Sequence, residues 1–156
     1  MNRKFVIVGA FILALAVSGP LMAQSKLFVG TWKLNVAKSK YDPGPAPRSQ
    51  TRAWGPTGKV SVDGLDGAGK PLKYGYTIKT DGKGYPTMGA IPNGADTIST
   101  TQIAPNTLEA TFKRAGKQVE MTTFAVSKDG KVLTITAKGV TPSGQSFNNV
   151  NVWDKQ

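Results

Sequence analysis

The sequence predicts an all-β domain, an antiparallel up-and-down meander of roughly eight to ten short strands that closes as a barrel. Apolar and polar residues alternate along most of the chain after residue 24, which is typical of strands with one buried face. Turn residues such as Asp-Gly and Pro-Asn recur between these strands, and no segment after residue 24 has a convincing helical period. The first and last segments are both strand-like, so pairing them closes a barrel economically. A two-sheet β-sandwich is the alternative.

Residues 1–23 have the composition of a signal peptide for bacterial export, which would be helical in the full chain. Arg3 and Lys4 form a positive start, residues 5–17 are apolar, and Ala23 is a small residue suited to cleavage. The apolar run is short for a bilayer span, so an uncleaved membrane anchor is the weaker alternative. We therefore expect a signal peptide at 1–23, a β-barrel domain at 24–156, and a mature protein that is periplasmic or secreted, without a transmembrane segment.

The first expected strand has Phe28, Gly30, Trp32, Leu34 and Val36 on one face. The segment that follows, residues 37–50, contains three prolines at alternate positions. Proline favours extended backbone and cannot donate a ladder hydrogen bond, so this segment is not a central strand. We expect an ordered loop that crosses one end of the barrel, and a disordered linker is the alternative.

Turn residues delimit the remaining expected strands, which lie at 51–54, 59–65, 71–80, 96–103, 107–114, 117–127, 132–138 and 145–154. The alternation is clearest in 71–80, where one face carries Leu72, Tyr74, Tyr76 and Ile78. In 117–127 the alternation slips between Met121 and Phe124, which predicts a β-bulge there. Residues 83–95 are rich in Gly and Pro, and we expect them to be irregular.

The composition argues against an enzyme. The chain has neither Cys nor His, which removes the commonest general base, the thiolate nucleophile and the usual transition-metal ligands. Most of its acidic residues lie at turns, where Asp bonds its own backbone. The two glutamates, Glu109 and Glu120, are expected on opposite sides of a hairpin, so they do not form a catalytic pair. We expect no catalytic residue, no metal site and no cofactor.

The chain is strongly basic, with 20 Lys and Arg against 9 Asp and Glu and a net charge of +11. Removing residues 1–23 takes away two basic residues and no acid, which leaves +9. Basic domains attract anionic partners such as lipopolysaccharide and acidic glycans. The lysines are spread along the chain without clustering, so we do not expect nucleic-acid binding, and a merely solvated surface is the simplest alternative.

The pair Gly30-x-Trp32, near the start of a small secreted meander, resembles the first-strand Gly-x-Trp pattern of lipocalins and related calycin barrels. The resemblance implies that Trp32 plugs the closed end of the barrel and that a basic residue stacks on it. Lys155 is the candidate for that residue, and Arg52 is the alternative. The run from Gly30 to Asn35, with the closing Val152–Gln156, also resembles a group of small secreted bacterial proteins without an assigned activity.

The aromatic residues on expected inward faces are the candidates for ligand binding. They are Tyr74, Tyr76, Phe112, Phe124 and Trp54. Inward residues of a small barrel either fill it or line a pocket, and two buried tyrosines on one strand favour a partly polar interior. We therefore expect a non-enzymatic exported barrel that binds a small apolar or amphipathic ligand. The alternatives are a basic surface that binds envelope polyanions and a purely structural envelope protein. The sequence does not specify the ligand or the oligomeric state.

Overall fold

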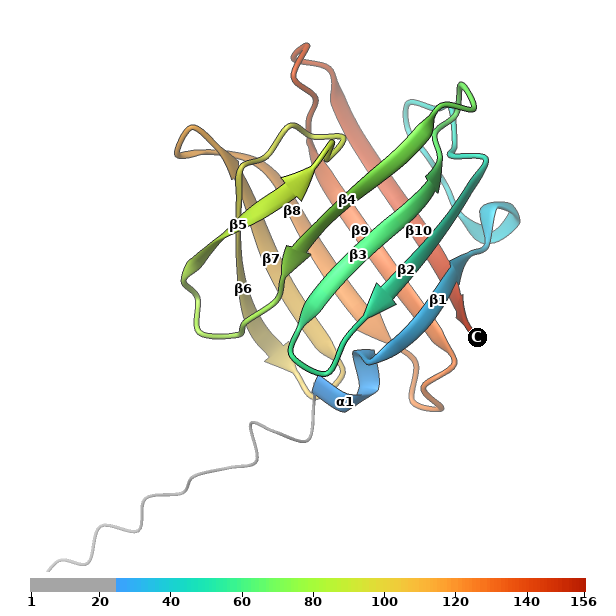
Figure 1. Ribbon diagram of the computed structural model, residues 1–156, viewed down its shortest axis with the longest axis vertical. Coiled ribbons are helices and arrows are strands. Elements are labelled where there is room, and N and C mark those ends of the chain that lie inside the picture. Colours follow the sequence, from blue (N-terminus) through green and yellow to red (C-terminus); the bar gives the residue numbers. More distant parts are fainter. Residues whose placement is uncertain (1–24) are drawn as a thin grey trace, which may run out of the picture.

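The computed structural model describes residues 25–156 and shows a closed antiparallel barrel of ten strands (Figure 1). Each strand pairs with its neighbours in the sequence, and the last strand pairs with the first. The strands are β1 (Gly30–Leu34), β2 (Ser49–Trp54), β3 (Lys59–Leu65), β4 (Pro71–Thr77), β5 (Gly84–Gly89), β6 (Thr97–Ala104), β7 (Thr107–Arg114), β8 (Lys117–Val126), β9 (Val132–Val140) and β10 (Ser146–Lys155).

This architecture confirms the predicted all-β up-and-down barrel and excludes the two-sheet sandwich. The proposed signal peptide and its cleavage site lie outside the described residues. Within residues 25–156 no helix has the length and apolar character needed to cross a membrane. Two single turns were not predicted: the α-helical turn α1 (Ser25–Phe28) and the 3-10 turn η1 (Val36–Lys38). Phe28 and Val36 therefore do not belong to β1, although both were assigned to its inward face.

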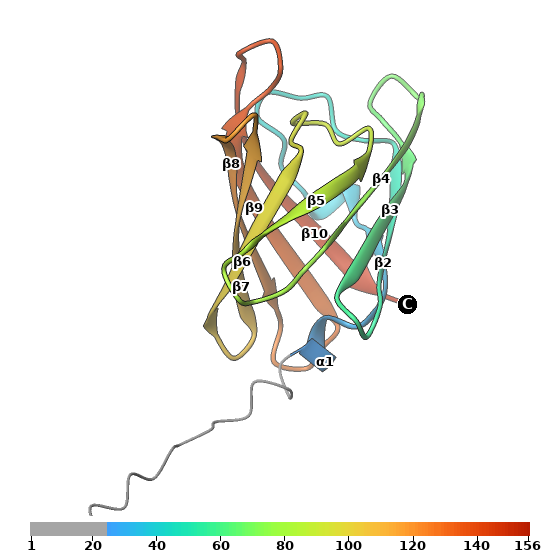
Figure 2. The same cartoon turned by 60° about the vertical axis from the view of Figure 1, so that its left-hand side comes forward.

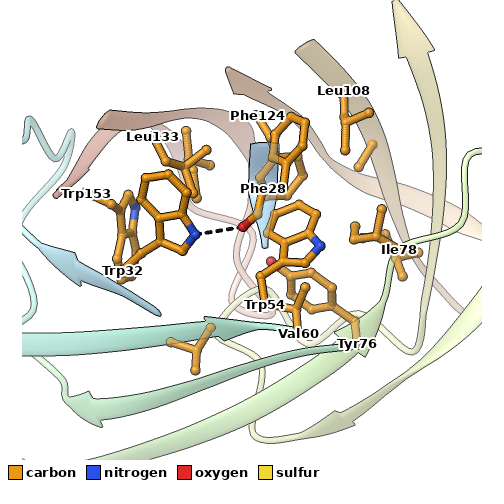
Figure 3. Packing of buried hydrophobic residues seen from close by; sticks show 14 of the residues in the cluster. Phe28, Trp32, Trp54, Val60, Tyr76, Ile78, Leu108, Phe124, Leu133 and Trp153 are labelled. Carbon is orange, nitrogen blue, oxygen red and sulfur yellow. Dashed lines mark hydrogen bonds between the residues drawn. The ribbon is translucent and has the colours of Figure 1, made fainter. Parts of the chain in front are cut away.

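Aromatic side chains close the end of the barrel next to α1 (Figure 3). Phe28 is 1% exposed, and its ring lies 4.9 Å from the ring of Trp54. The Trp32 indole Nε1 donates to the Phe28 carbonyl at 2.8 Å, which satisfies an acceptor that the end of a helical turn leaves free. The rings thus fill the interior at this end, and one indole fixes α1 across it.

The opposite end carries the loops that follow β1, β3, β5, β7 and β9 (Figure 2). The first of these loops is ordered by contacts with β10. Lys40 bridges to Val150, and the Asn148 amide donates to the Asp42 carbonyl at 2.7 Å. These bonds confirm the predicted crossing loop and rule out a disordered linker.

Two expectations about strands were wrong. Residues 83–95 contain β5, a strand that includes Pro86 and has only three paired residues on each side. The bulge in β8 lies at Val119, between the pairs Phe112 with Glu120 and Lys113 with Gln118, and not between Met121 and Phe124. The bulge lies near the loop end of β8, and it sets which residues of that strand face the interior.

Candidate functional site

A cavity of about 460 Å³ occupies the loop end of the barrel. Prolines of the β1–β2 loop and residues of the β3–β4, β5–β6 and β9–β10 loops surround its outer part. Its wall is apolar on several strands: Leu72, Phe112, Phe124, Ile135, Ala137 and Phe147. Polar side chains form the rest: Gln50, Arg52, Tyr74, Tyr76, Glu120, Thr122, Asn149 and Asn151. A cavity of this size with mixed lining suits a small amphipathic molecule.

Arg52 is the least expected residue of this wall. The alternation of β2 places Gln50, Arg52 and Trp54 inward, and Arg52 is only 4% exposed. Its Nη1 donates a short hydrogen bond to the Tyr76 hydroxyl, and its guanidinium lies 4.8 Å from the Trp153 ring. Its Nε is buried and has no hydrogen-bond partner among residues 25–156. A permanently charged group thus lies beside the cavity with part of its bonding capacity unused.

Arg52 also lacks a carboxylate partner. The single ion pair among the described residues joins Lys73 and Asp63 at 3.4 Å on the exposed surface. A buried guanidinium is costly unless it is paired and fully hydrogen-bonded. The tyrosine hydroxyl and the indole face of Trp153 stabilise the charge only in part.

The two tyrosines of β4 supply neutral hydroxyls next to this charge. Burial raises the pKa of both Tyr74 and Tyr76 above the ordinary value, although the Arg52 charge opposes the shift. Both therefore remain protonated and can donate hydrogen bonds at neutral pH. The Tyr76 ring meets the edge of Phe112 at 5.5 Å and is held by that contact and by Arg52.

Glu120 lies on the other side of the cavity wall with both carboxylate oxygens satisfied. The Thr122 hydroxyl donates to Oε1, and the Asn93 amide Nδ2 donates to Oε2 at 2.6 Å. Burial raises the pKa of Glu120, while these two bonds and the Arg52 charge oppose the shift. Asn93 belongs to the β5–β6 loop, so the carboxylate also ties that loop to β8.

Most of the predicted ligand-binding residues come together at this cavity. Tyr74, Tyr76, Phe112 and Phe124 line it. Trp54 does not, because it packs at the closed end between Phe28 and Phe124, at ring distances of 4.9 and 5.7 Å. Tyr41, in the crossing loop, lines the outer part, and burial raises its pKa to about 12.

The residues of the expected plug gather around β1. Trp32 is fully buried and lies opposite Lys155 on β10 and Arg52 on β2. Lys155 Nζ lies 5.0 Å from the centre of the Trp32 ring, whereas Arg52 lies over Trp153. Gly30 has a φ of 141°, and a Cβ there would come within 2.7 Å of the Lys155 side chain. The glycine of Gly-x-Trp therefore makes room for the lysine.

Several polar residues of the cavity are not predicted from the sequence. Arg52 was considered only for the plug, although its alternation with Gln50 and Trp54 places it on the inward face of β2. Glu120 was set aside as one half of an unformed catalytic pair. Its inward position depends on the bulge at Val119, whereas the sequence pattern predicts the bulge further along the strand.

A scan against models of known protein families found no match, and a search of curated proteins found no similar sequence. Within residues 25–156 no group of three or more acidic side chains could hold a metal ion. The assignment of a function therefore depends on the cavity itself.

Proposed function

We propose that this protein is an exported, non-enzymatic, lipocalin-like barrel that binds a small amphipathic molecule in its cavity. The observation that carries the proposal is a cavity of about 460 Å³ with a mixed apolar and polar wall and one buried, incompletely bonded arginine. A barrel that only had to be stable would favour apolar filling, because an unpaired buried charge is destabilising. Tyr74, Tyr76, Phe112 and Phe124 are the aromatic residues that the ligand would contact.

Native mass spectrometry of the mature protein purified from the periplasm tests this proposal. We expect a reproducible added mass that disappears on denaturation. Ala137 lines the cavity, so Ala137→Phe places a ring in the space that the ligand needs and should abolish the added mass. Ala53 is exposed on β2, so Ala53→Phe makes the same change outside and should retain it. If the wild-type protein carries no ligand and takes up none from envelope extracts, the proposal fails.

A second candidate is binding of envelope polyanions by the outer surface. The observation in its favour is that 18 basic and 9 acidic residues after residue 24 form a single ion pair, which leaves most cations free. Binding of lipopolysaccharide would then weaken steeply as salt rises from low to high ionic strength. Binding that is unaffected by salt, or that Ala137→Phe abolishes, would contradict a surface mechanism.

A further inference from the structure

We propose that the ligand is an organic anion whose acid group binds Arg52 and whose apolar part extends toward the loop end of the barrel. This inference depends on the proposed ligand-binding function and adds the charge and the orientation of the ligand. The acid group of the ligand would be a carboxylate or another group with a single negative charge. Three features of the cavity support it.

The first feature is the unused bonding capacity of Arg52. Arg52 is only 4% exposed, yet its Nε has no hydrogen-bond partner. No carboxylate of residues 25–156 forms an ion pair with it. A guanidinium presents its donors in a planar fork that matches the two oxygens of a carboxylate. An acid group in the cavity would supply the missing acceptor and the missing negative charge together.

The second feature is the donor that lies beside this fork. The Tyr76 hydroxyl oxygen accepts from Arg52 Nη1, so its own proton is free to point toward another acceptor. No hydrogen bond donated by this hydroxyl is formed within residues 25–156. The raised pKa of Tyr76 keeps that proton in place at neutral pH. A single anion would therefore meet a charged donor and a neutral donor at one point.

The third feature distinguishes an anion from a cation. Glu120 is the acidic residue that lines the inner cavity, and both of its oxygens already accept hydrogen bonds from Thr122 and Asn93. A cationic ligand would have to share Glu120 with these donors and would lie in the field of the nearby Arg52 charge. Each Glu120 oxygen thus accepts one hydrogen bond already, whereas the Arg52 Nε donor has no acceptor, and this difference favours an anion over a cation.

The distribution of apolar residues sets the orientation. Arg52 lies at mid-barrel, where β2 pairs it with Trp32 and Val62. Leu72 lies further along β4 toward the loop end, and Phe147 lies near the loop-end start of β10, opposite Gly139. Ile91 and the prolines of the crossing loop line the same outer region. In the bound ligand the acid group therefore lies deep in the cavity at Arg52, and the apolar part lies against the residues near the loop end.

Isothermal titration calorimetry with three probes of equal chain length tests the inference: decanoate, decan-1-ol and decyltrimethylammonium. We expect the wild-type protein to bind decanoate about tenfold or more tightly than decan-1-ol, since only decanoate can form charge-assisted hydrogen bonds with Arg52. The cationic probe should bind most weakly. Arg52→Met should bring decanoate to the affinity of decan-1-ol and leave decan-1-ol unchanged. Arg48→Met removes the same charge from an exposed position outside the cavity and should retain the preference.

Tyr76→Phe provides a second variant in case Arg52→Met does not fold, which circular dichroism will show. It keeps the ring contact with Phe112 and removes only the hydroxyl, so it should weaken decanoate and spare decan-1-ol. Equal or tighter binding of decan-1-ol by the wild type, or a preference that survives Arg52→Met, overturns the anion assignment but leaves the binding function intact. Failure of all three probes to bind wild-type protein overturns both.

Discussion

Removing the Tyr76 hydroxyl should destabilise the barrel, and only while Arg52 is present. Tyr76→Phe keeps the ring, which is 2% exposed and packs against Phe112, so the change creates no cavity of side-chain size. It deletes the acceptor of the Arg52 Nη1 bond. Losing a hydrogen bond to a charged group costs about 1.5–3 kcal/mol. The adjacent cavity gives water access to the freed donor, so we expect a value near the lower limit, about 1.5 kcal/mol.

Urea unfolding, monitored by tryptophan fluorescence, measures this cost. For a domain of this size the slope of free energy against urea is about 1–3 kcal/mol/M, so the midpoint should fall by roughly 0.5–1.5 M with an unchanged slope. The second arm is a double-mutant cycle with Arg52→Met. In the methionine background the Tyr76→Phe change should have almost no effect, which gives a coupling energy of about 1 kcal/mol or more.

Tyr74→Phe is the matched control, because Tyr74 is on the same strand and its hydroxyl is also buried near Arg52 without being the partner of Nη1. Its loss should cost less and show weaker coupling to Arg52→Met. Additive effects of Tyr76→Phe and Arg52→Met would refute the idea that the hydroxyl stabilises the buried charge. The anionic site derived from that pair would then lose its physical basis.

Three further predictions concern the rest of the barrel. Lys155→Met should lower the free energy of unfolding by about 0.5–1 kcal/mol, the usual contribution of an exposed cation over an indole, measured in the same urea assay. Because burial raises the pKa of Glu120 above 4.5, the folded state retains its proton at higher pH than the unfolded chain, and this group lowers stability as pH rises through that window. The midpoint difference between Glu120→Gln and wild type should therefore grow upward from pH 4.5, and a constant difference would contradict the assignment. Backbone amides of β5 should exchange hydrogen fastest among the ten strands, since β5 has three paired residues on each side, and slower exchange there than in β7 would refute this.

The barrel could be predicted from the sequence because the alternation of apolar and polar residues in strands and the residues that form turns are local properties of the chain. β3, β7 and β9 begin at the positions that the alternation indicates. The failures have local causes as well. Pro86 and its neighbouring glycines obscure a strand that tertiary pairing on both sides stabilises despite poor propensity. The turn α1 is too short to show a helical period, and the Trp32 indole that fixes it comes from the following strand.

The cavity was predictable only in its aromatic part. Tyr74, Tyr76, Phe112 and Phe124 alternate on inward faces, and a hydropathy pattern detects such residues directly. Arginine and glutamate are ordinarily assigned to the solvent face because burial of an unpaired charge is unfavourable, and this general rule outweighed the position of Arg52 on the same face as Trp54.

Arg52 nevertheless lies inside, where the Tyr76 hydroxyl is its hydrogen-bond partner. Tyr76 is on β4, two strands away around the barrel and 24 residues along the chain. Sequence patterns of period two contain no information about contacts of that kind. A buried charge that the sequence pattern does not predict, and that its neighbours only partly compensate, is typical of a functional site. The tyrosine hydroxyl accepts from one donor of the guanidinium, and Nε has no partner among residues 25–156. This remaining donor is the basis on which we propose a ligand that brings its own negative charge.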